Sequence, residues 1–544
     1  MQQLLLNTRP IPDPCPFLSL APFFIHCHHY TPFPLLNPPS IPTGVSRAHP
    51  EWAKVLSYSI LFYEAQRSGK LPSDNRVEWR HDSALEDGKD LGLNLSGGWF
   101  DAGDYLKFTF PYAFTLTQLA WGGQAFWDGY VLSGQAQYFS SQMRWGYDWL
   151  IAAHPQPSTL VVQVGDGNVD NNYWGPDTNI PVPRPAFIIN PDNPGTDVAG
   201  EAAAAFAAGS LLFRQRFLDT AYADTLLQHA KDVFAFADSA RYSLYQKSVS
   251  ASEAFYASSS YEDEMCWGAA WLWKATGTAS YLDRAAAWID AGKLRGQRSS
   301  VDWNSKTGAC FVLLASSNAT DWVTEAEAYL DAVVAAKSPA KLTQGGLLWY
   351  NDASPADSTV PANNAIFLLF LYAESLPTDH PKRQRYLDFA QKQSEYILGR
   401  NPEKTPYVCG LHHNSPQNPH HAGSSGGTDI SNIRNSPPVS EHTLFGAVVG
   451  GPDEMDTFKD DRADYLQNEV ALDYNSPFQG WAARQVMYST EDPPFVGLPY
   501  ITRMSKDSSI EPHAQTWNRP AIQNDPELQT SARTYHEPYS ASRK

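Results

Sequence analysis

The stretch "SGGWFDAGDYLKF", residues 96–108, places two acids, Asp101 and Asp104, three positions apart between glycines and aromatic side chains. A lone D-x-x-D is most often a solvated turn in which one aspartate caps the helix that follows. So dense an aromatic setting is unusual for a solvated turn. Two interpretations, a capped turn and a pair of functional carboxyls, therefore stay open on this stretch alone.

Helical periodicity dominates on both sides of this stretch. Apolar residues recur at i, i+3 and i+4 in long blocks, whereas strand-like alternation is scarce. We predict an all-α domain over 49–492, built of helix pairs and joined by long loops. The Pro-rich lead 1–48 is expected to be disordered or an error in the gene model, and the polar tail 493–544 to be disordered. The expected helices are 51–66, 113–128, 136–153, 197–216, 221–239, 261–275, 278–292, 320–336, 361–374, 382–398 and 476–488.

The composition excludes several classes of partner. The formal net charge of −18, with no stripe of Lys and Arg to offset it, excludes nucleic acid. The chain has no apolar run of 18 or more residues, so we expect no membrane span. Its five cysteines include no C-x-x-C, which excludes a zinc knuckle or a dense disulfide framework and leaves one internal bridge open.

Several motifs resemble one enzyme family in the same order along the chain. They are "WRHDSALEDGKDLGLNLSGGWFDAGDYLKF" at 79–108, "PGTDVAGEAAAAFAA" at 194–208, "YEDEMCWGAAWLWKATGTASYL" at 261–282 and "FKDDRADYLQNEVALDYNSPF" at 458–478. This set resembles glycoside hydrolase family nine, the inverting β-1,4-glucanases that include many cellulases, over roughly 51–490. The resemblance implies an (α/α)6 toroid whose long loops form an open cleft, and an endo-type cellulase activity.

Breaking a glycosidic bond needs two carboxyls in different protonation states. Glu469 lies between Tyr465, Leu466 and Val470, an apolar setting that favours a protonated carboxyl, so it is our candidate general acid. The polar, glycine-rich surroundings of Asp104 favour an ionised carboxylate. The resemblance gives Asp104 the role of general base and Asp101 that of holding the attacking water. The alternative for Glu469 is an exposed helix glutamate.

The resemblance adds three site residues. It marks Asp460 as an active-site acid, although a surface charge cluster is the alternative. Arg462 matches the D-x-R of the same block and is predicted to pair with a carboxylate and to contact substrate. His420, in "CGLHHNSPQNPHHAGSSGG" (409–427), is predicted to contact sugar hydroxyls. Four histidines in this stretch also allow a metal site, which we do not favour because no partner stands at zinc spacing.

Aromatic side chains supply candidate platforms for sugar rings, each with a core position as its alternative. The chain departs from the family pattern at four positions, which suggests an altered cleft with its chemistry intact. The candidate platforms are Trp174, Trp303, Trp349 and Tyr474, and the departures are His81, Asn171, Asp177 and Ala422.

The expected chemistry requires no cofactor. Some members of the family that the chain resembles hold a structural calcium near the motif at 261–282. This resemblance makes Asp263 and Glu264 candidate ligands, although calcium needs six to eight oxygens. We expect a monomer that meets a β-glucan outside the cell, because the polymer cannot enter. Mixed-linkage glucan, xyloglucan, glucomannan and chitosan remain alternative substrates. A non-catalytic glycan-binding relative or a pure interaction protein is less consistent with three retained acids.

Overall fold

The computed structural model describes residues 50–239 and 241–501, which all belong to one compact unit. The predicted lead 1–48 and most of the predicted tail lie outside the described residues. Structure extends past the expected boundary at 492, because a 3-10 helix, Pro494–Gly497, follows it and buries Phe495. Within the described ranges, no helix is both long and apolar enough to cross a bilayer.

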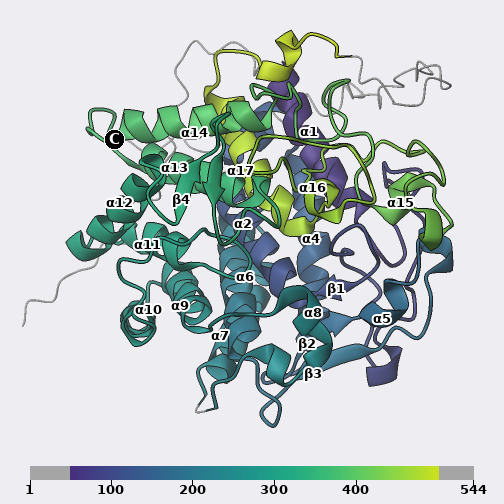
Figure 1. The fold of residues 1–544 in the computed structure, drawn as a ribbon. Helices are drawn as coiled ribbons and strands as arrows, with labels where there is room; N and C mark the ends of the chain where they lie inside the picture. Colours follow the sequence, from purple (N-terminus) through teal and green to yellow (C-terminus); the bar gives the residue numbers. More distant parts are fainter. Residues whose placement is uncertain (1–49, 240, 502–544) are drawn as a thin grey trace, which may run out of the picture. The chain divides into compact units, whose positions relative to one another are not determined.

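Long helices of the described region form two nested sets (Figure 1). Each helix of the inner set contacts the next, and the last contacts the first, so that the set closes into a ring. The inner helices are α2 (Thr109–Ala125), α6 (Thr196–Gln215), α9 (Glu262–Thr276), α11 (Thr307–Ala315), α13 (Thr359–Ser375) and α17 (Leu472–Tyr488). The outer helices are α1 (Pro50–Ala65), α4 (Ala136–Ala153), α7 (Thr220–Ala237), α10 (Ala279–Ala291), α12 (Thr320–Val334) and α14 (Arg383–Ile397).

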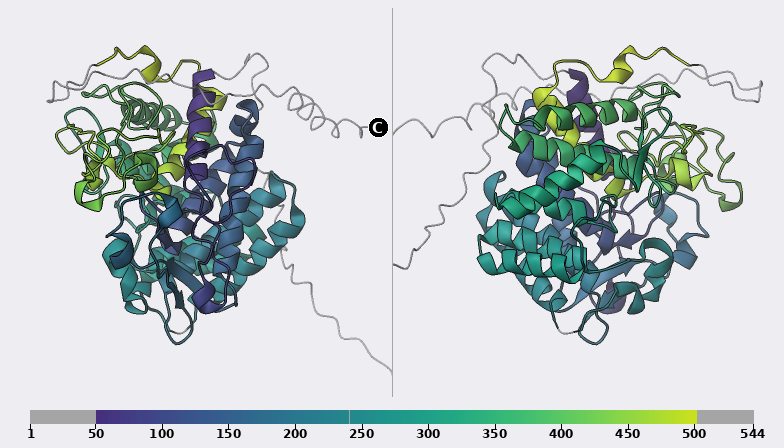
Figure 2. Two further views of the ribbon diagram at one scale, coloured as in Figure 1. Left: turned by 90° about the vertical axis from the view of Figure 1, so that its right-hand side faces the viewer. Right: turned by 60° about the vertical axis from the view of Figure 1, so that its left-hand side comes forward.

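Burial separates the two sets as their sequences predict. The inner helices α2, α6, α13 and α17 are buried on nearly every side, because most of their residues are apolar or small and the polar side chains among them are buried as well. The outer helix α7 buries one stripe, which includes Ala223, Leu226, Ala230 and Val233, and exposes the rest. The right-hand view of Figure 2 brings the outer helices between about 280 and 400 forward.

Glycines let inner helices approach closely. A Cβ on Gly268 of α9 would lie 2.7 Å from the carbonyl oxygen of Gly200 on α6, which is closer than real Cβ contacts. The alanine-rich sequence of α6 keeps the rest of this interface shallow. Larger side chains here would push the two helices apart and open the ring.

Five short strands interrupt the helical pattern. β1 (Lys107–Phe108), β2 (Leu160–Val164) and β3 (Ala186–Ile189) form an antiparallel sheet in that order. β4 (Ala340–Leu342) and β5 (Leu348–Tyr350) form a second antiparallel pair. The first sheet starts immediately after the stretch that carries Asp101 and Asp104, and so anchors it.

The remaining chain runs in long loops with short helices. The loop-rich stretch between about 400 and 470, green to yellow, gathers on one side of the helices in both views of Figure 2. It contains α15 (Ala422–Ser425) and α16 (Tyr465–Asn468), and other short helices are α3 (Trp127–Leu132), α5 (Gly167–Asp170) and α8 (Glu253–Tyr256).

A disulfide joins Cys266 of α9 to Cys310 of α11, two neighbours in the inner ring, and Cys409 is free and buried. The one internal bridge that the sequence left open is therefore present. Cross-linking residues 44 positions apart restricts the unfolded chain and is worth about 4 kcal/mol in the loop-entropy account.

We expect the double variant Cys266→Ser/Cys310→Ser to unfold at a clearly lower temperature than the native chain, because this restriction of the unfolded state is lost. Thermal unfolding with and without a reducing agent measures the effect, and Cys409→Ser is the matched control. An unchanged melting temperature in the double variant would contradict the expectation. So would a reducing agent that lowers the melting temperatures of the native chain and of the double variant equally.

Candidate active site

The turn that carries Asp101 and Asp104 is held by its own backbone. The amide of Asp101 donates to the carbonyl of Leu106 at 2.9 Å, and the amide of Leu106 donates to Asp104 Oδ1 at 3.2 Å. Asp101 is 3% exposed, whereas Asp104 is half-buried. Asp104 is therefore the acid of the pair that keeps access to solvent.

Glu469 lies in the connection between α16 and α17. The side chain of Asp464 caps α16 by accepting from the amides of Leu466 and Gln467, and Glu469 ends the helix in an extended conformation. Its carbonyl accepts a hydrogen bond from the amide of Gly450 at 2.9 Å. The Glu469 side chain is half-buried, so the structure places it as a held, partly accessible acid rather than an exposed helix glutamate.

Backbone hydrogen bonds bring the two acid-bearing segments together. The amide of Leu472 donates to the carbonyl of Asp101 at 3.0 Å, and the amide of Ala422 donates to that of Gly103 at 2.8 Å. His420 forms a parallel bridge with Glu469. A Cβ on Gly103 would lie 1.9 Å from the carbonyl oxygen of His420, so only glycine fits between these segments. Asp101, Asp104, Glu469 and His420 consequently belong to one site.

The electrostatics of the site favour protonated carboxyls. Burial, followed by the negative charge of Asp473, raises the pKa of Glu469 to about 7. Burial also raises the pKa of Asp101 and Asp104 well above the usual aspartate range, with Asp170 adding to the effect at Asp104. Perturbed carboxyls of this kind are typical of acid–base sites.

Three further polar groups that the sequence analysis did not select lie in the site. The first is Tyr256 in α8, whose hydroxyl donates to Asp101 Oδ2. The second is Asp170, whose Oδ2 accepts from the amide of Tyr105 at 3.3 Å. Asp473, on the first turn of α17, is fully buried. Its spacing of four residues from Glu469 was a usable signal, whereas nothing in the sequence around Tyr256 points to Asp101.

The surroundings of His420 hold its ring in place and favour its neutral form. Its Nδ1 lies 2.6 Å from the carbonyl oxygen of Arg462, and its ring lies 4.9 Å from that of Trp174. Burial lowers the pKa of His420. A neutral imidazole beside Glu469 is suited to hydrogen bonding with a neutral hydroxyl.

Asp460 and Arg462 contact the loop that carries His420. Asp460 accepts hydrogen bonds from the amides of Gln417 and Asn418, and Arg462 donates to Asn418 Oδ1 at 2.9 Å. Arg462 is 1% exposed. Burial lowers its pKa, and the negative charge of Asp460 opposes this shift. A cavity of about 300 Å³ adjoins both residues. These contacts position the loop. The negative charges that act on Arg462 are those of Asp460 and Asp461, in the same D-x-R block.

The four predicted aromatic platforms differ in exposure. Trp303 is half-buried, and its ring lies 4.9 Å from that of Tyr256, which places it beside the site. Trp174 is 5% exposed and donates to Ser425 Oγ. Tyr474 is also buried and donates to Asp357, and Trp349 lies on β5. Trp303 therefore has the most ring surface available for a ligand.

The departures from the family pattern fall into two groups. The ring of His81 and its amide both contact Asp177, which also lies 3.5 Å from the guanidinium of Arg80. Ala422 packs against Phe100 and Trp174, and Asn171 is exposed at the end of α5. His81 and Asp177 thus form one coupled change, which keeps Arg80 paired.

Asp263 and Glu264 are engaged by protein groups. Asp263 accepts from Ser260 and from the amide of Lys306, and the Lys306 ammonium lies 3.0 Å from Glu264 and 3.3 Å from Glu201. Within the described residues, no three His, Cys, Asp or Glu side chains are grouped to hold a metal ion. Both predicted calcium ligands are therefore bonded to protein groups in this structure.

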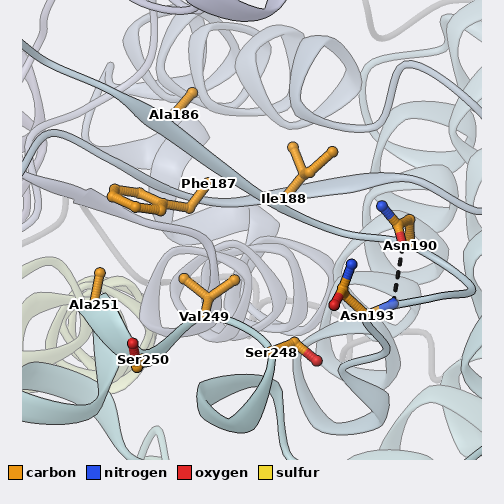
Figure 3. A pocket seen from close by; sticks show the side chains of 9 residues that line it. All are labelled: Ala186, Phe187, Ile188, Asn190, Asn193, Ser248, Val249, Ser250 and Ala251. Atoms are coloured by element: carbon orange, nitrogen blue, oxygen red, sulfur yellow. Dashed lines mark hydrogen bonds between the residues drawn. The ribbon is translucent and has the colours of Figure 1, made fainter.

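A cavity of about 530 Å³ lies away from the acids, between β3 and the stretch 248–251 (Figure 3). Phe187 and Ile188 line it from the strand, and Asn190 and Asn193 lie together at one end. It holds none of the predicted site residues.

Helix pairs arranged as an inner and an outer ring, with two partly exposed carboxyls in one loop-lined site, are the arrangement expected of a glycoside hydrolase. A family model described as glycosyl hydrolase family 9 matches residues 52–482, and the chain belongs to this family. The predicted (α/α)6 fold is thereby confirmed.

Named relatives extend this assignment. Endoglucanase A of Bacillus pumilus is 41% identical over 80% of the chain, which spans only 66% of that protein's length. Endoglucanase 15 of Arabidopsis thaliana is 39% identical over 79% of the chain and 92% of that protein. The solved structure of an endoglucanase from the termite Nasutitermes takasagoensis matches with a TM-score of 0.75 and 40% identity, over 80% of this chain and 98% of that one.

We expect Tyr256→Phe to lower kcat roughly 10- to 100-fold with little change in KM, because the hydrogen bond that holds the buried carboxyl of Asp101 is lost. Steady-state kinetics on cello-oligosaccharides measure the effect. The exposed Tyr242→Phe is the matched control. Equal kcat in both variants would remove Tyr256 from the site.

Proposed function

We propose that the chain hydrolyses internal β-1,4-glucosidic bonds in cellulose and related β-glucans with inversion of the anomeric carbon. The observation that carries this proposal is the convergence of Asp104 and Glu469, from opposite ends of the chain, through the Leu472–Asp101 hydrogen bond. Relatives named endoglucanases support the substrate class.

In the proposed mechanism, Glu469 donates its proton to the leaving glycosidic oxygen. Asp104 accepts a proton from a water that attacks the anomeric carbon from the opposite face, and Asp101, held by Tyr256, orients that water. Inverting enzymes keep the two carboxyls roughly 6.5–9.5 Å apart to accommodate the water. One proton therefore enters at Asp104 and one leaves from Glu469 in each turnover.

The remaining site groups suit a neutral, extended glycan. The half-buried face of Trp303 offers a stacking surface, and His420, positioned through Arg462 and Asp460, offers a hydrogen-bonding group. We propose that the enzyme acts outside the cell, because its polymeric substrate does not enter cells. We also propose that it acts as a monomer.

Ala422 favours a second candidate substrate. The family's usual arginine would supply a hydrogen bond here, whereas Ala422 packs among aromatic rings. The same chemistry on mixed-linkage glucan, xyloglucan or glucomannan is therefore the alternative, and a non-catalytic glycan-binding role is the outcome if no glycan is cleaved.

The test is to incubate the full chain with barley β-glucan and a soluble cellulose derivative, follow new reducing ends, and read the first-formed anomer by proton NMR. New α-anomer from a β-linked chain is the expected result. First-formed β-anomer would overturn the assigned roles of Asp104 and Glu469. Cleavage of another β-glycan alone would select the alternative substrate.

The pH dependence of kcat/KM should report the same two acids. Glu469 must carry its proton, and its pKa is raised to about 7, so activity is present below this pH and falls as the pH rises through it. Asp104 must be ionised, and its raised pKa moves the acid limb above the usual aspartate range. Profiles on neutral cello-oligosaccharides test this. An alkaline limb near the usual glutamate value of about 4.3 would contradict it.

A further inference from the structure

Asp473 is a buried acid to which the proposed mechanism gives no role. It is the second residue of α17, and its side chain is fully buried. No other side chain among the described residues bonds to either carboxylate oxygen, and the donors that act on them are the backbone amides of residues 473 and 474. Burying an unpaired carboxylate is costly, so a chain that keeps one in a functional site has a reason beyond packing.

Acids and tyrosines, rather than cations, surround Asp473. Lys306, a cation that lowers the pKa of Asp473, is already paired with Glu201 and Glu264, and burial and Asp302 act on this pKa more strongly than it does. The groups that face Asp473 or Glu469 from the elements packed around them are Tyr63 of α1, Asp101 and Asp104 of the turn before β1, Tyr256 of α8, Asp302 before α11, Asp357 before α13, and Tyr474 of α17.

The position of Asp473 favours a charged carboxylate there. The first turn of a helix carries unsatisfied amide groups and a positive dipole end, which stabilise an anion. Asp473 lies on that turn of α17, close to the amides of residues 473 and 474. Glu469, four residues earlier, lies outside the helix and is open to the site. Burial raises the pKa of both carboxyls to about 7, but at Asp473 the amides of residues 473 and 474 oppose this rise. Of the two neighbouring carboxyls, Asp473 is therefore better placed to hold the charge, and Glu469 to hold a proton.

We propose that Asp473 is a positioning residue of the active site, whose buried carboxylate keeps the proton on Glu469 between turnovers. This inference rests on the proposed role of Glu469 as general acid. When Glu469 has given its proton to the leaving oxygen, two adjacent anions remain. Their repulsion favours uptake of a proton from water by Glu469, the accessible member of the pair.

Asp473→Asn keeps the shape of the side chain and removes its charge. The alkaline limb of kcat/KM should move to lower pH by about one unit, because one like charge no longer opposes ionisation of Glu469. It should stay above the usual glutamate value, because burial remains the larger cause. KM should not change, and the melting temperature should be equal or higher, because an unpaired buried charge is removed.

Two variants control this result. Asp197→Asn changes another fully buried aspartate, also the second residue of an inner helix, α6, whose carboxylate accepts from Tyr245 and Val198 instead of facing Glu469. It should leave the limb in place. Asp473→Glu keeps the charge and should restore the native limb. An unmoved limb in a folded, active Asp473→Asn protein would overturn the proposal, as would an equal shift in Asp197→Asn.

Carbon-13 NMR of the native chain keeps the inference testable if Asp473→Asn does not fold or if the native chain cleaves no β-glucan. The carboxyl signal of Glu469, identified by its loss in Glu469→Gln, should titrate near neutral pH with a second inflection from Asp473. A single step near the usual glutamate value of about 4.3 would overturn the proposal. Absence of cleavage by the native chain would instead count against the proposed function.

Discussion

Glu469→Gln is expected to lower kcat on cellulosic glucans by on the order of 10²–10⁴-fold, because the variant has no proton to give to the leaving oxygen. Glutamine preserves the size of the side chain and its place between α16 and α17. KM should change little. The loss should therefore appear in kcat at every pH.

The leaving group distinguishes this role from a general loss of structure. A dinitrophenyl β-cellobioside releases a phenolate that needs no proton, so Glu469→Gln should recover much of the native rate on this substrate. Parallel kinetics on a cello-oligosaccharide and on the dinitrophenyl substrate measure the difference. An equal loss on both substrates would mean that Glu469 is not the general acid.

Asp104→Asn is the second variant with a large expected effect, also on the order of 10²–10⁴-fold in kcat. Here the lost step is removal of a proton from the attacking water, which every substrate requires. The dinitrophenyl substrate should therefore not restore the rate. A small anionic nucleophile such as azide needs no deprotonation and should restore part of it.

Asp461→Asn is a control for charge removal near the site. Its carboxylate is paired with Arg434 and Lys459. These partners outweigh the effect of burial and lower the pKa of Asp461 to about 2. This variant should keep native selectivity between the two substrates. If Asp104→Asn were restored by the better leaving group, the roles of Asp104 and Glu469 would have to be exchanged.

The helical fold could be predicted because most helices bury a regular apolar pattern. Eleven of the long helices follow from periodicity, with start points off by up to four residues at α2 and α17. The twelfth, α11, was missed, because its nine residues are apolar or small apart from Thr307, and so short an apolar run does not distinguish a helix from a strand. The short strands depend on partners distant in sequence, which local patterns do not contain.

Site residues within motifs were accessible to sequence reasoning, whereas their partners were not. Asp101, Asp104, Glu469 and His420 lie in recognisable blocks, and the structure brings them together. Tyr256 reaches Asp101 across 155 positions, a contact that only the closed ring of helices creates. The partner of Glu264, one of the two predicted calcium ligands, could not be read from the sequence. Nothing local indicates that the Lys306 ammonium lies between Glu201 and Glu264.

Closure of the inner ring between α17 and α2 has a consequence for biosynthesis. The proposed base, Asp104, immediately precedes the first inner helix and the proposed acid, Glu469, immediately precedes the last, and the hydroxyl of Tyr63 donates to the carbonyl of Leu472 across 409 positions. A nascent chain on the ribosome therefore carries half an active site until its final inner helix emerges and docks. In the proposed mechanism, catalytic competence is therefore acquired in a single late event, and we expect a prematurely terminated product that lacks α17 to be inert toward polymeric glucan.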